Sequence, residues 1–147
     1  MGDMAKACSY LFSSSLFKGN VMSGRLGALM EPALEIIRDS IARADLLAIA
    51  SRQFGDMVKA VVDIDRRIMA IGAELHADEE AALLEDGSAQ AVLWGINLYP
   101  NEPGDALIEF DSMINVRPSQ GNRSRTVENE TTREQIRTVV RLLVRDA

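Results

Sequence analysis

Hydrophobic and polar positions alternate along residues 107–116. The apolar positions of one parity are Ile108, Phe110, Ile114 and Val116, and the polar positions of the other are Glu109, Asp111, Asn115 and Arg117. Side chains on a strand point to opposite faces with period two. The pattern predicts a strand that packs one face on a core and presents carboxylate, amide and guanidinium groups on the other.

Short apolar runs predict four further strands. They cover residues 33–38, 58–64, 68–71 and 92–99. Only three residues connect the second of these strands to the third, so the two should pair as antiparallel neighbours. We also expect residues 92–99 to pair antiparallel with residues 107–116.

Three segments repeat apolar residues at helical spacing. The first lies around residues 46–54, the second follows His76, and the third begins at Thr131, where Glu134 completes a T-x-x-E capping box. The predicted order is β-α-β-β-α-β-β-α. This order indicates an α+β fold with a mainly antiparallel sheet and helices packed on one face.

The length of 147 residues and the 47% hydrophobic content predict one globular domain. Residues 1–30 differ from the rest, because they carry three basic residues, one acid and a serine run. A transit peptide is one interpretation of this stretch. We favour the other, a poorly ordered N-terminal extension, followed by a single α+β domain over residues 31–147.

A single cysteine, Cys8, excludes an internal disulfide framework and fits a reducing compartment. No apolar run is long enough to span a membrane. We therefore expect a cytoplasmic protein without a membrane partner.

The net charge of −6 is unevenly distributed. Residues 31–116 carry 17 acidic and 6 basic residues, whereas residues 117–147 carry 7 arginines and 4 acids. The acidic middle argues against broad nucleic-acid binding, because it repels phosphates. Nucleic-acid binding confined to the last helix stays a hypothesis, because arginines repeat there every four residues, at positions 133, 137, 141 and 145. The alternative is a solvated face with ion pairs.

The polar face of the last strand is the first candidate site. Glu109 and Asp111 could share a proton or a cation. The neighbouring strand adds Asn97 on the matching parity, and polar faces of a hairpin lie side by side. The alternative is the wet face of a half-covered sheet.

The only histidine, His76, is the second candidate. With a carboxylate partner it could act as a general base, and with several carboxylates it could hold a divalent metal. The spacing matches no metal motif, and a single histidine excludes a multi-histidine metal site within one chain. The alternative is a histidine that caps the helix or pairs with a nearby acid.

The loop of residues 117–125 is the third candidate. Arg117, Arg123 and Arg125 could bind a phosphate or carboxylate, and Asn122 adds an amide. The loop lacks the spacing of a phosphate-binding Walker A motif. Alternatively, its arginines pair with the acidic middle of the chain.

Four segments together resemble a known family. They read FGDMVKAVVDID, GAELHADEEAALLEDGSAQ, LWGINLYP and IEFDSMINVRPSQGNRSRTVE. They are similar to the signature segments of a small family of short bacterial and archaeal proteins, classed as a domain of unknown function. The resemblance runs from about residue 31 to residue 143. It implies no particular reaction, and it places residues 1–30 before the family's usual start.

The first functional hypothesis is a site for a small polar or anionic ligand, or a divalent metal, on the polar sheet face. Its catalytic residues would be His76, Glu109 and Asp111, and its ligand-binding residues Asn97, Asn115, Arg117, Asn122, Arg123 and Arg125. It predicts that the loop of residues 117–125 folds over this face. The second hypothesis is a non-catalytic module for oligomerisation or protein interaction. The third is nucleic-acid binding by the arginines of the last helix. Whether the protein is an enzyme, and with which cofactor, stays open.

Overall fold

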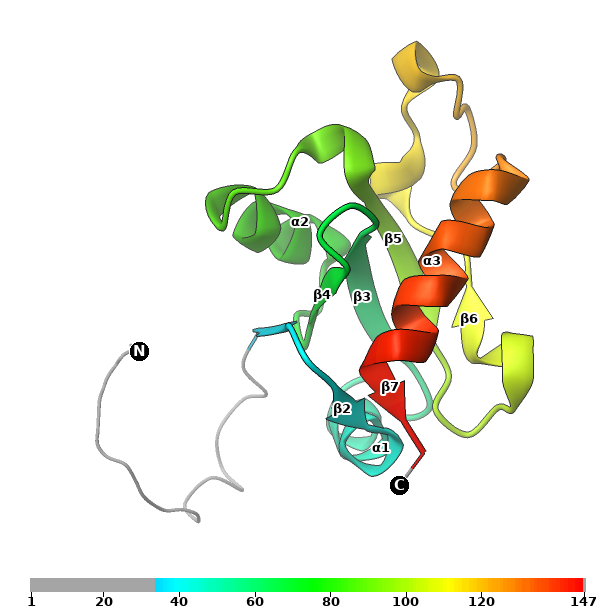
Figure 1. The fold of residues 1–147 in the computed structure, drawn as a ribbon. Helices are drawn as coiled ribbons and strands as arrows, with labels where there is room; N and C mark the ends of the chain where they lie inside the picture. The colour runs from blue at the N-terminus through cyan, green and yellow to red at the C-terminus, as the bar shows by residue number, and fades with distance from the viewer. Residues whose placement is uncertain (1–33, 147) are drawn as a thin grey trace. The chain divides into compact units, whose positions relative to one another are not determined.

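A computed structural model describes residues 34–146 of the chain. The predicted N-terminal extension, residues 1–30, lies outside the described residues. The described part has three α-helices and a five-stranded sheet, which confirms the predicted α+β class (Figure 1).

All five strands of the sheet run antiparallel to their neighbours. In spatial order they are β1 (Glu35–Ile37), β4 (Ile68–Ile71), β3 (Val58–Asp63), β5 (Leu93–Leu98) and β6 (Ile108–Glu109). Both predicted antiparallel pairings are therefore confirmed.

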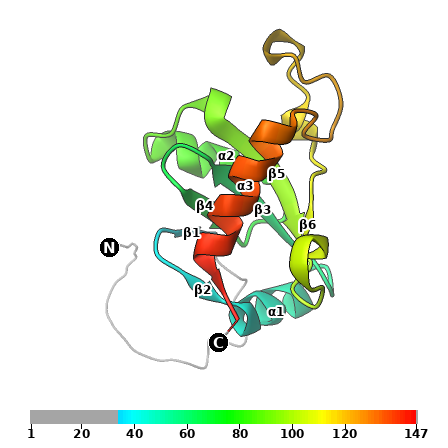
Figure 2. The ribbon, with the colours of Figure 1, turned by 45° about the vertical axis from the view of Figure 1, so that its right-hand side comes forward.

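The helices cover both faces of the sheet, so the expectation of helices on one face is wrong (Figure 2). Helices α1 (Arg43–Arg52) and α3 (Glu130–Leu143) share the larger core with Trp94, Ile96 and Leu98. Helix α2 (His76–Glu85) instead packs Leu83 among apolar residues of the other face. Local periodicity shows which side of a helix is apolar, but not which face of the sheet that side covers.

Helix α2 buries only part of its face of the sheet. Leu83 shares a small core with Val61, Ala70 and Leu93. Farther along the same face, Lys59 of β3 pairs with Asn97 of β5, which pairs with Glu109 of β6. Residues directly opposite on neighbouring strands project to the same face. The fold therefore places a row of three polar side chains beside the N-terminal end of α2.

Two local features differ from expectation. Helix α3 is capped by Asn129, whose Oδ1 accepts from the Thr132 backbone N–H at 3.0 Å, and not by the predicted capping box at Thr131. A parallel pair of two-residue strands, β2 (Ile41–Ala42) and β7 (Val144–Arg145), was not predicted. Segments of two residues are too short to show an alternating pattern.

The predicted strand over residues 107–116 is wrong beyond its first residues, because β6 ends at Glu109. Ser112 then starts a 3-10 turn over Met113–Asn115. The Asn115 amide accepts from the Gly95 N–H at 2.9 Å and donates to the Gly95 carbonyl at 3.0 Å. The edge of β5 is thus completed by a side chain where a longer β6 would supply backbone.

Gly95 allows this turn to lie against β5, because a Cβ atom there would stand 2.5 Å from the Ser112 Cβ. We expect Gly95→Ala to lower the free energy of unfolding by about 1–3 kcal/mol through overpacking. Urea unfolding followed by Trp94 fluorescence measures the loss. The double variant Gly95→Ala/Ser112→Gly should recover part of it. A Gly95→Ala protein as stable as the parent would contradict the close approach.

Candidate functional site

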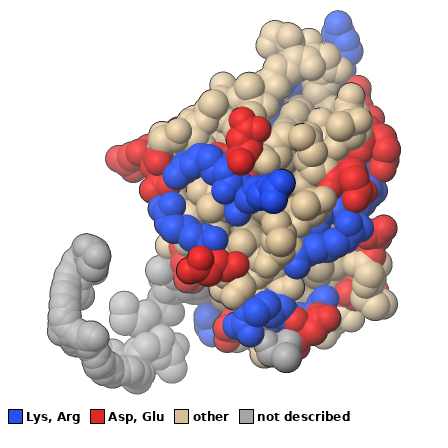
Figure 3. Space-filling view, viewed as in Figure 1, with Lys and Arg blue, Asp and Glu red and all other residues tan. Residues whose placement is uncertain are grey.

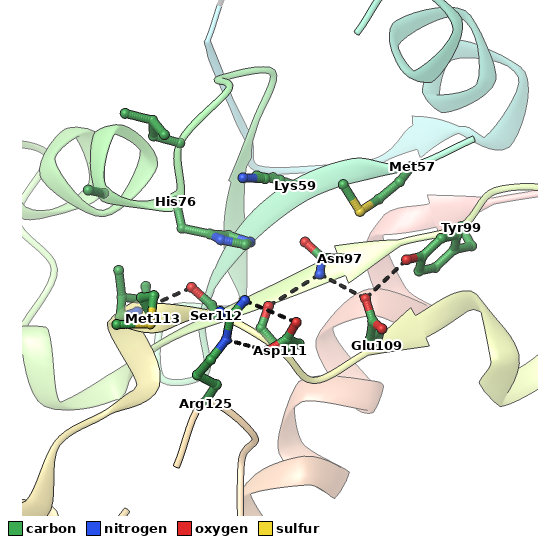
Figure 4. Close-up of a pocket in the computed structure, with 13 residues that line it drawn as sticks. Met57, Lys59, His76, Asn97, Tyr99, Glu109, Asp111, Ser112, Met113 and Arg125 are labelled. Carbon is green, nitrogen blue, oxygen red and sulfur yellow. Dashed lines mark hydrogen bonds and ion pairs between the residues drawn. The ribbon is translucent and has the colours of Figure 1, made fainter. Parts of the chain in front are cut away.

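A cavity of about 550 Å³ opens on the sheet face that α2 leaves uncovered (Figure 4). We call it the sheet-face cavity. Its walls come from β3, β5, β6, the start of α2 and the segment after β6. The lining residues are Met57, Lys59, Leu75, His76, Ala77, Asn97, Tyr99, Glu109, Asp111, Ser112, Met113, Ile114 and Arg125. Five residues predicted for a site thus meet here: His76, Asn97, Glu109, Asp111 and Arg125.

His76, the first residue of α2, reaches across to β5. Its Nε2 lies 2.8 Å from the Ile96 carbonyl oxygen, so we assign the ring proton to Nε2. Burial lowers the pKa of the imidazole, and Lys59 lowers it further, while the Ile96 bond, Asp111 and the Asn97 side chain act in the opposite direction. The ring is therefore neutral at neutral pH, with a lone pair on Nδ1. It does not cap its helix.

Asn97 stands at the centre of the polar row. Its Nδ2 donates to Glu109 Oε1 at 2.9 Å and to the Asp111 backbone carbonyl at 3.2 Å. Its Oδ1 is buried without a hydrogen-bond partner among residues 34–146. A buried acceptor without a donor is costly. This oxygen has almost no solvent-accessible surface, so a ligand N–H or O–H group would satisfy it only after a shift of the side chains around it.

The two carboxylates of the cavity have separate partners. Glu109 also accepts from the Tyr99 hydroxyl at 3.0 Å. Burial, together with Glu109, raises the pKa of Tyr99, which keeps the phenol protonated as a donor. Asp111 forms a bidentate ion pair with Arg125, at 2.8 and 3.2 Å. Glu109 and Asp111 are thus each held by their own donors rather than joined to one another.

Lys59 lines the cavity, although no sequence pattern marked it as a site residue. Its Nζ lies 5.1 Å from the Phe54 ring centroid. No carboxylate within residues 34–146 forms an ion pair with it. The available signal was a lysine inside the apolar run VKAVVDI, the only lysine after residue 18.

The sequence pattern also did not mark Glu79 as a buried acid. It lies three residues after His76 and is fully buried, with Oε2 accepting from the Ala73 N–H at 3.1 Å and Oε1 without a partner in the described residues. Burial raises its pKa to about 9 against the opposing effects of the Ala73 N–H and of nearby Lys59, so the group is a neutral acid at pH 7. In the sequence it looked like an acid favourable to the helix dipole, which gave no sign of burial.

Asn115 and Arg117 do not line the sheet-face cavity, although the alternating pattern placed them there. The side-chain amide of Asn115 forms its hydrogen bonds with the backbone of Gly95 and Arg125. Arg117 stacks on Trp94 at 4.2 Å from the ring centroid and donates to the Gln90 carbonyl at 2.7 Å and to the Leu93 carbonyl. Both side chains satisfy backbone groups at the edge of β5.

Asn122 and Arg123 also lie outside the sheet-face cavity. Asn122 is buried and donates through Nδ2 to the carbonyls of Asn115, Thr126 and Ser124, at 2.7, 2.8 and 3.0 Å. Arg123 is an exposed residue of the same loop. Asn122 therefore stabilises the loop, and only Arg125 of the loop reaches the polar sheet face.

Two arginines of α3 form ion pairs with nearby acidic side chains. Arg137 pairs with Glu130 and Glu134, at 2.8 and 3.1 Å, and Arg141 pairs with Glu134 and Asp105, at 3.1 and 3.3 Å. Figure 3 shows basic and acidic side chains intermixed over this face of the molecule. A nucleic-acid surface would need these cations free of acids.

Among residues 34–146, no three His, Cys, Asp or Glu side chains converge so that they could hold a metal ion. The metal version of the first hypothesis therefore has no support in the described part of the chain.

These features define a class: a compact α+β domain whose antiparallel sheet carries a polar cavity on a half-covered face. The chain belongs to the family described as "Protein of unknown function (DUF5674)", whose match covers residues 35–143. The predicted family membership is thereby confirmed. The comparisons with curated proteins and with solved structures gave no match. None of the helices in the described part of the chain is long and apolar enough to cross a lipid bilayer.

Proposed function

We propose that the sheet-face cavity binds a small organic molecule with an anionic group and at least one hydrogen-bond donor. The observation that carries this proposal is the pairing of Lys59 with Asn97 across β3 and β5. Within residues 34–146, Lys59 is a cation without a carboxylate in an ion pair, and Asn97 holds a buried acceptor without a donor. A ligand anion on Lys59 would satisfy the first, and a ligand hydroxyl or amine that reaches Asn97 Oδ1 through a shift of the neighbouring side chains would satisfy the second.

The remaining polar groups support this division of roles. Glu109 orients Asn97 and Tyr99, and Arg125 neutralises Asp111. These two carboxylates therefore position other groups, and the charge of Lys59 is left for the ligand. Neutral His76 offers Nδ1 as a general base toward a donor bound at Asn97. We accordingly propose binding as the basic function and His76 as the group that would move a proton.

Glycolate tests the binding proposal, because it combines a carboxylate with one hydroxyl. We expect its titration into ¹⁵N-labelled protein to shift the backbone amides of His76, Asn97 and Glu109 in NMR spectra. Lys59→Gln should weaken the binding at least tenfold, on the order of 1.4 kcal/mol. Arg52→Gln, which removes a surface cation from α1, should leave the affinity unchanged.

Two results would count against the proposal. Shifts spread over surface arginines would indicate unspecific anion binding. Equal affinities of the parent and Lys59→Gln proteins would show that Lys59 does not bind the ligand anion.

A further inference from the structure

The rim of the sheet-face cavity is apolar. Leu75, which precedes α2, is 57% exposed, and Met113, in the turn after β6, is 65% exposed. Both line the cavity, although 38 positions separate them in the sequence, and Met57 and Ile114 add further apolar lining. Large apolar side chains that gather exposed around a cavity are typical of a surface covered by a ligand or partner.

We infer that the ligand of this cavity is an amphipathic organic anion. This inference rests on the proposed function. The carboxylate or phosphate of the ligand binds Lys59, a donor beside it binds Asn97 Oδ1, and an apolar body lies between Leu75 and Met113. The polar row and the apolar rim are thus two parts of one recognition surface.

The size of the cavity supports an extended ligand. A cavity of about 550 Å³ lies in the range of sites that hold drug-sized organic molecules. A head group that contacts only Lys59 and Asn97 would fill a small part of it. A purely polar ligand of that small size would leave Leu75 and Met113 in contact with water. Methionine side chains are flexible and polarisable, so Met57 and Met113 can adapt to an apolar body of variable shape.

Three probes, applied to the full chain, separate the head of the ligand from its body. Glycolate carries the head alone, 2-hydroxyhexanoate adds four carbons to the same head, and 1,2-hexanediol keeps the chain and hydroxyl without the carboxylate. We expect 2-hydroxyhexanoate to bind at least tenfold more tightly than glycolate, since each buried methylene contributes up to about fourfold. The diol should bind at least tenfold more weakly than 2-hydroxyhexanoate. 2-Hydroxyhexyl phosphate, which keeps the hydroxyl and the four-carbon tail, compares phosphate with carboxylate in the same titration. Tight binding of either amphipathic anion supports the inference.

Rim variants locate the apolar contact. Leu75→Ser and Met113→Ser should each reduce the advantage of 2-hydroxyhexanoate over glycolate and leave the affinity for glycolate unchanged. Leu142→Ser is the matched control, because Leu142 is 53% exposed on α3 and does not line the cavity. It should change neither affinity.

The outcomes distinguish this inference from the proposed function. Equal binding of glycolate and 2-hydroxyhexanoate would overturn the amphipathic ligand and leave the polar site intact. Absence of binding by all probes would overturn both. Tight binding of the diol would show that the ligand needs no anionic head group. A dimer in light scattering that Leu75→Ser or Met113→Ser dissociates would assign the rim to a second copy of the chain, and would overturn the inference.

Discussion

Replacing Asn115 with alanine is expected to lower the free energy of unfolding by about 2–5 kcal/mol. The Asn115 amide is fully buried and satisfies both the N–H and the carbonyl of Gly95, and it also donates to the Arg125 carbonyl at 3.0 Å. Its loss leaves buried backbone groups of β5 without partners. Urea unfolding followed by Trp94 fluorescence measures the change. Asn101→Ala, in an exposed loop, should change the stability by less than about 0.5 kcal/mol.

Asn115→Asp keeps the shape of the side chain and sharpens this test. A carboxylate oxygen would replace the donor that faces the carbonyls of Gly95 and Arg125. The variant should therefore be unstable at neutral pH and regain stability in mild acid, where the group is protonated and donates again. An Asn115→Ala protein with parental stability would show that the edge of β5 does not depend on this amide.

The stability of the parent protein should fall as the pH rises from about 4.5 to about 9, and Glu79→Gln should remove this contribution. The folded state raises the pKa of Glu79 from 4.5 to about 9. Between these values the folded protein holds one proton more than the unfolded chain, so each rise in pH favours unfolding. The full shift corresponds to an upper bound of about 6 kcal/mol. Glutamine mimics the protonated acid and cannot ionise.

The comparison uses the unfolding free energies of both proteins at pH 5 and pH 8.5. The Glu79→Gln protein should be at least about 2 kcal/mol more stable than the parent at pH 8.5, and close to it at pH 5. Glu85→Gln, at the exposed end of α2, is the control and should follow the parent. Identical pH profiles of the parent and Glu79→Gln proteins would show that Glu79 is ionised in the folded state.

Local pattern was sufficient to predict the three helices and, up to Glu109, the strands of the five-stranded sheet. Apolar runs and short connections predicted the antiparallel pairing of β3 with β4 and of β5 with β6, because side-chain period and loop length are properties of neighbouring residues. The wording of four segments identified the family. The same alternation also placed Glu109 beside Asn97, and these two residues do pair across β5 and β6.

The alternating pattern gave wrong positions after Ser112, because a 3-10 turn there changes which sheet face the odd-numbered residues occupy. After Ser112, Asn115 and Arg117 leave the row of Glu109 and serve backbone groups of β5. A single 3-10 turn removes the relation between sequence parity and sheet face, and a strand template cannot show such a turn. Hydrogen bonding of exposed strand edges is a requirement of the assembled sheet, so only the tertiary structure shows which side chains meet it.

The sequence by itself determined the fold class, the order of the three helices and of the five strands of the main sheet, the family, and five residues that line one cavity. The tertiary structure decided that α2 covers the second face of the sheet, which brings His76 and buried Glu79 beside Lys59. It also decided that no carboxylate within residues 34–146 forms an ion pair with Lys59, and that Asn97 Oδ1 has no hydrogen-bond donor in the same part of the chain. Burial and charge pairing depend on contacts between distant segments, and these contacts exist only once the chain has folded.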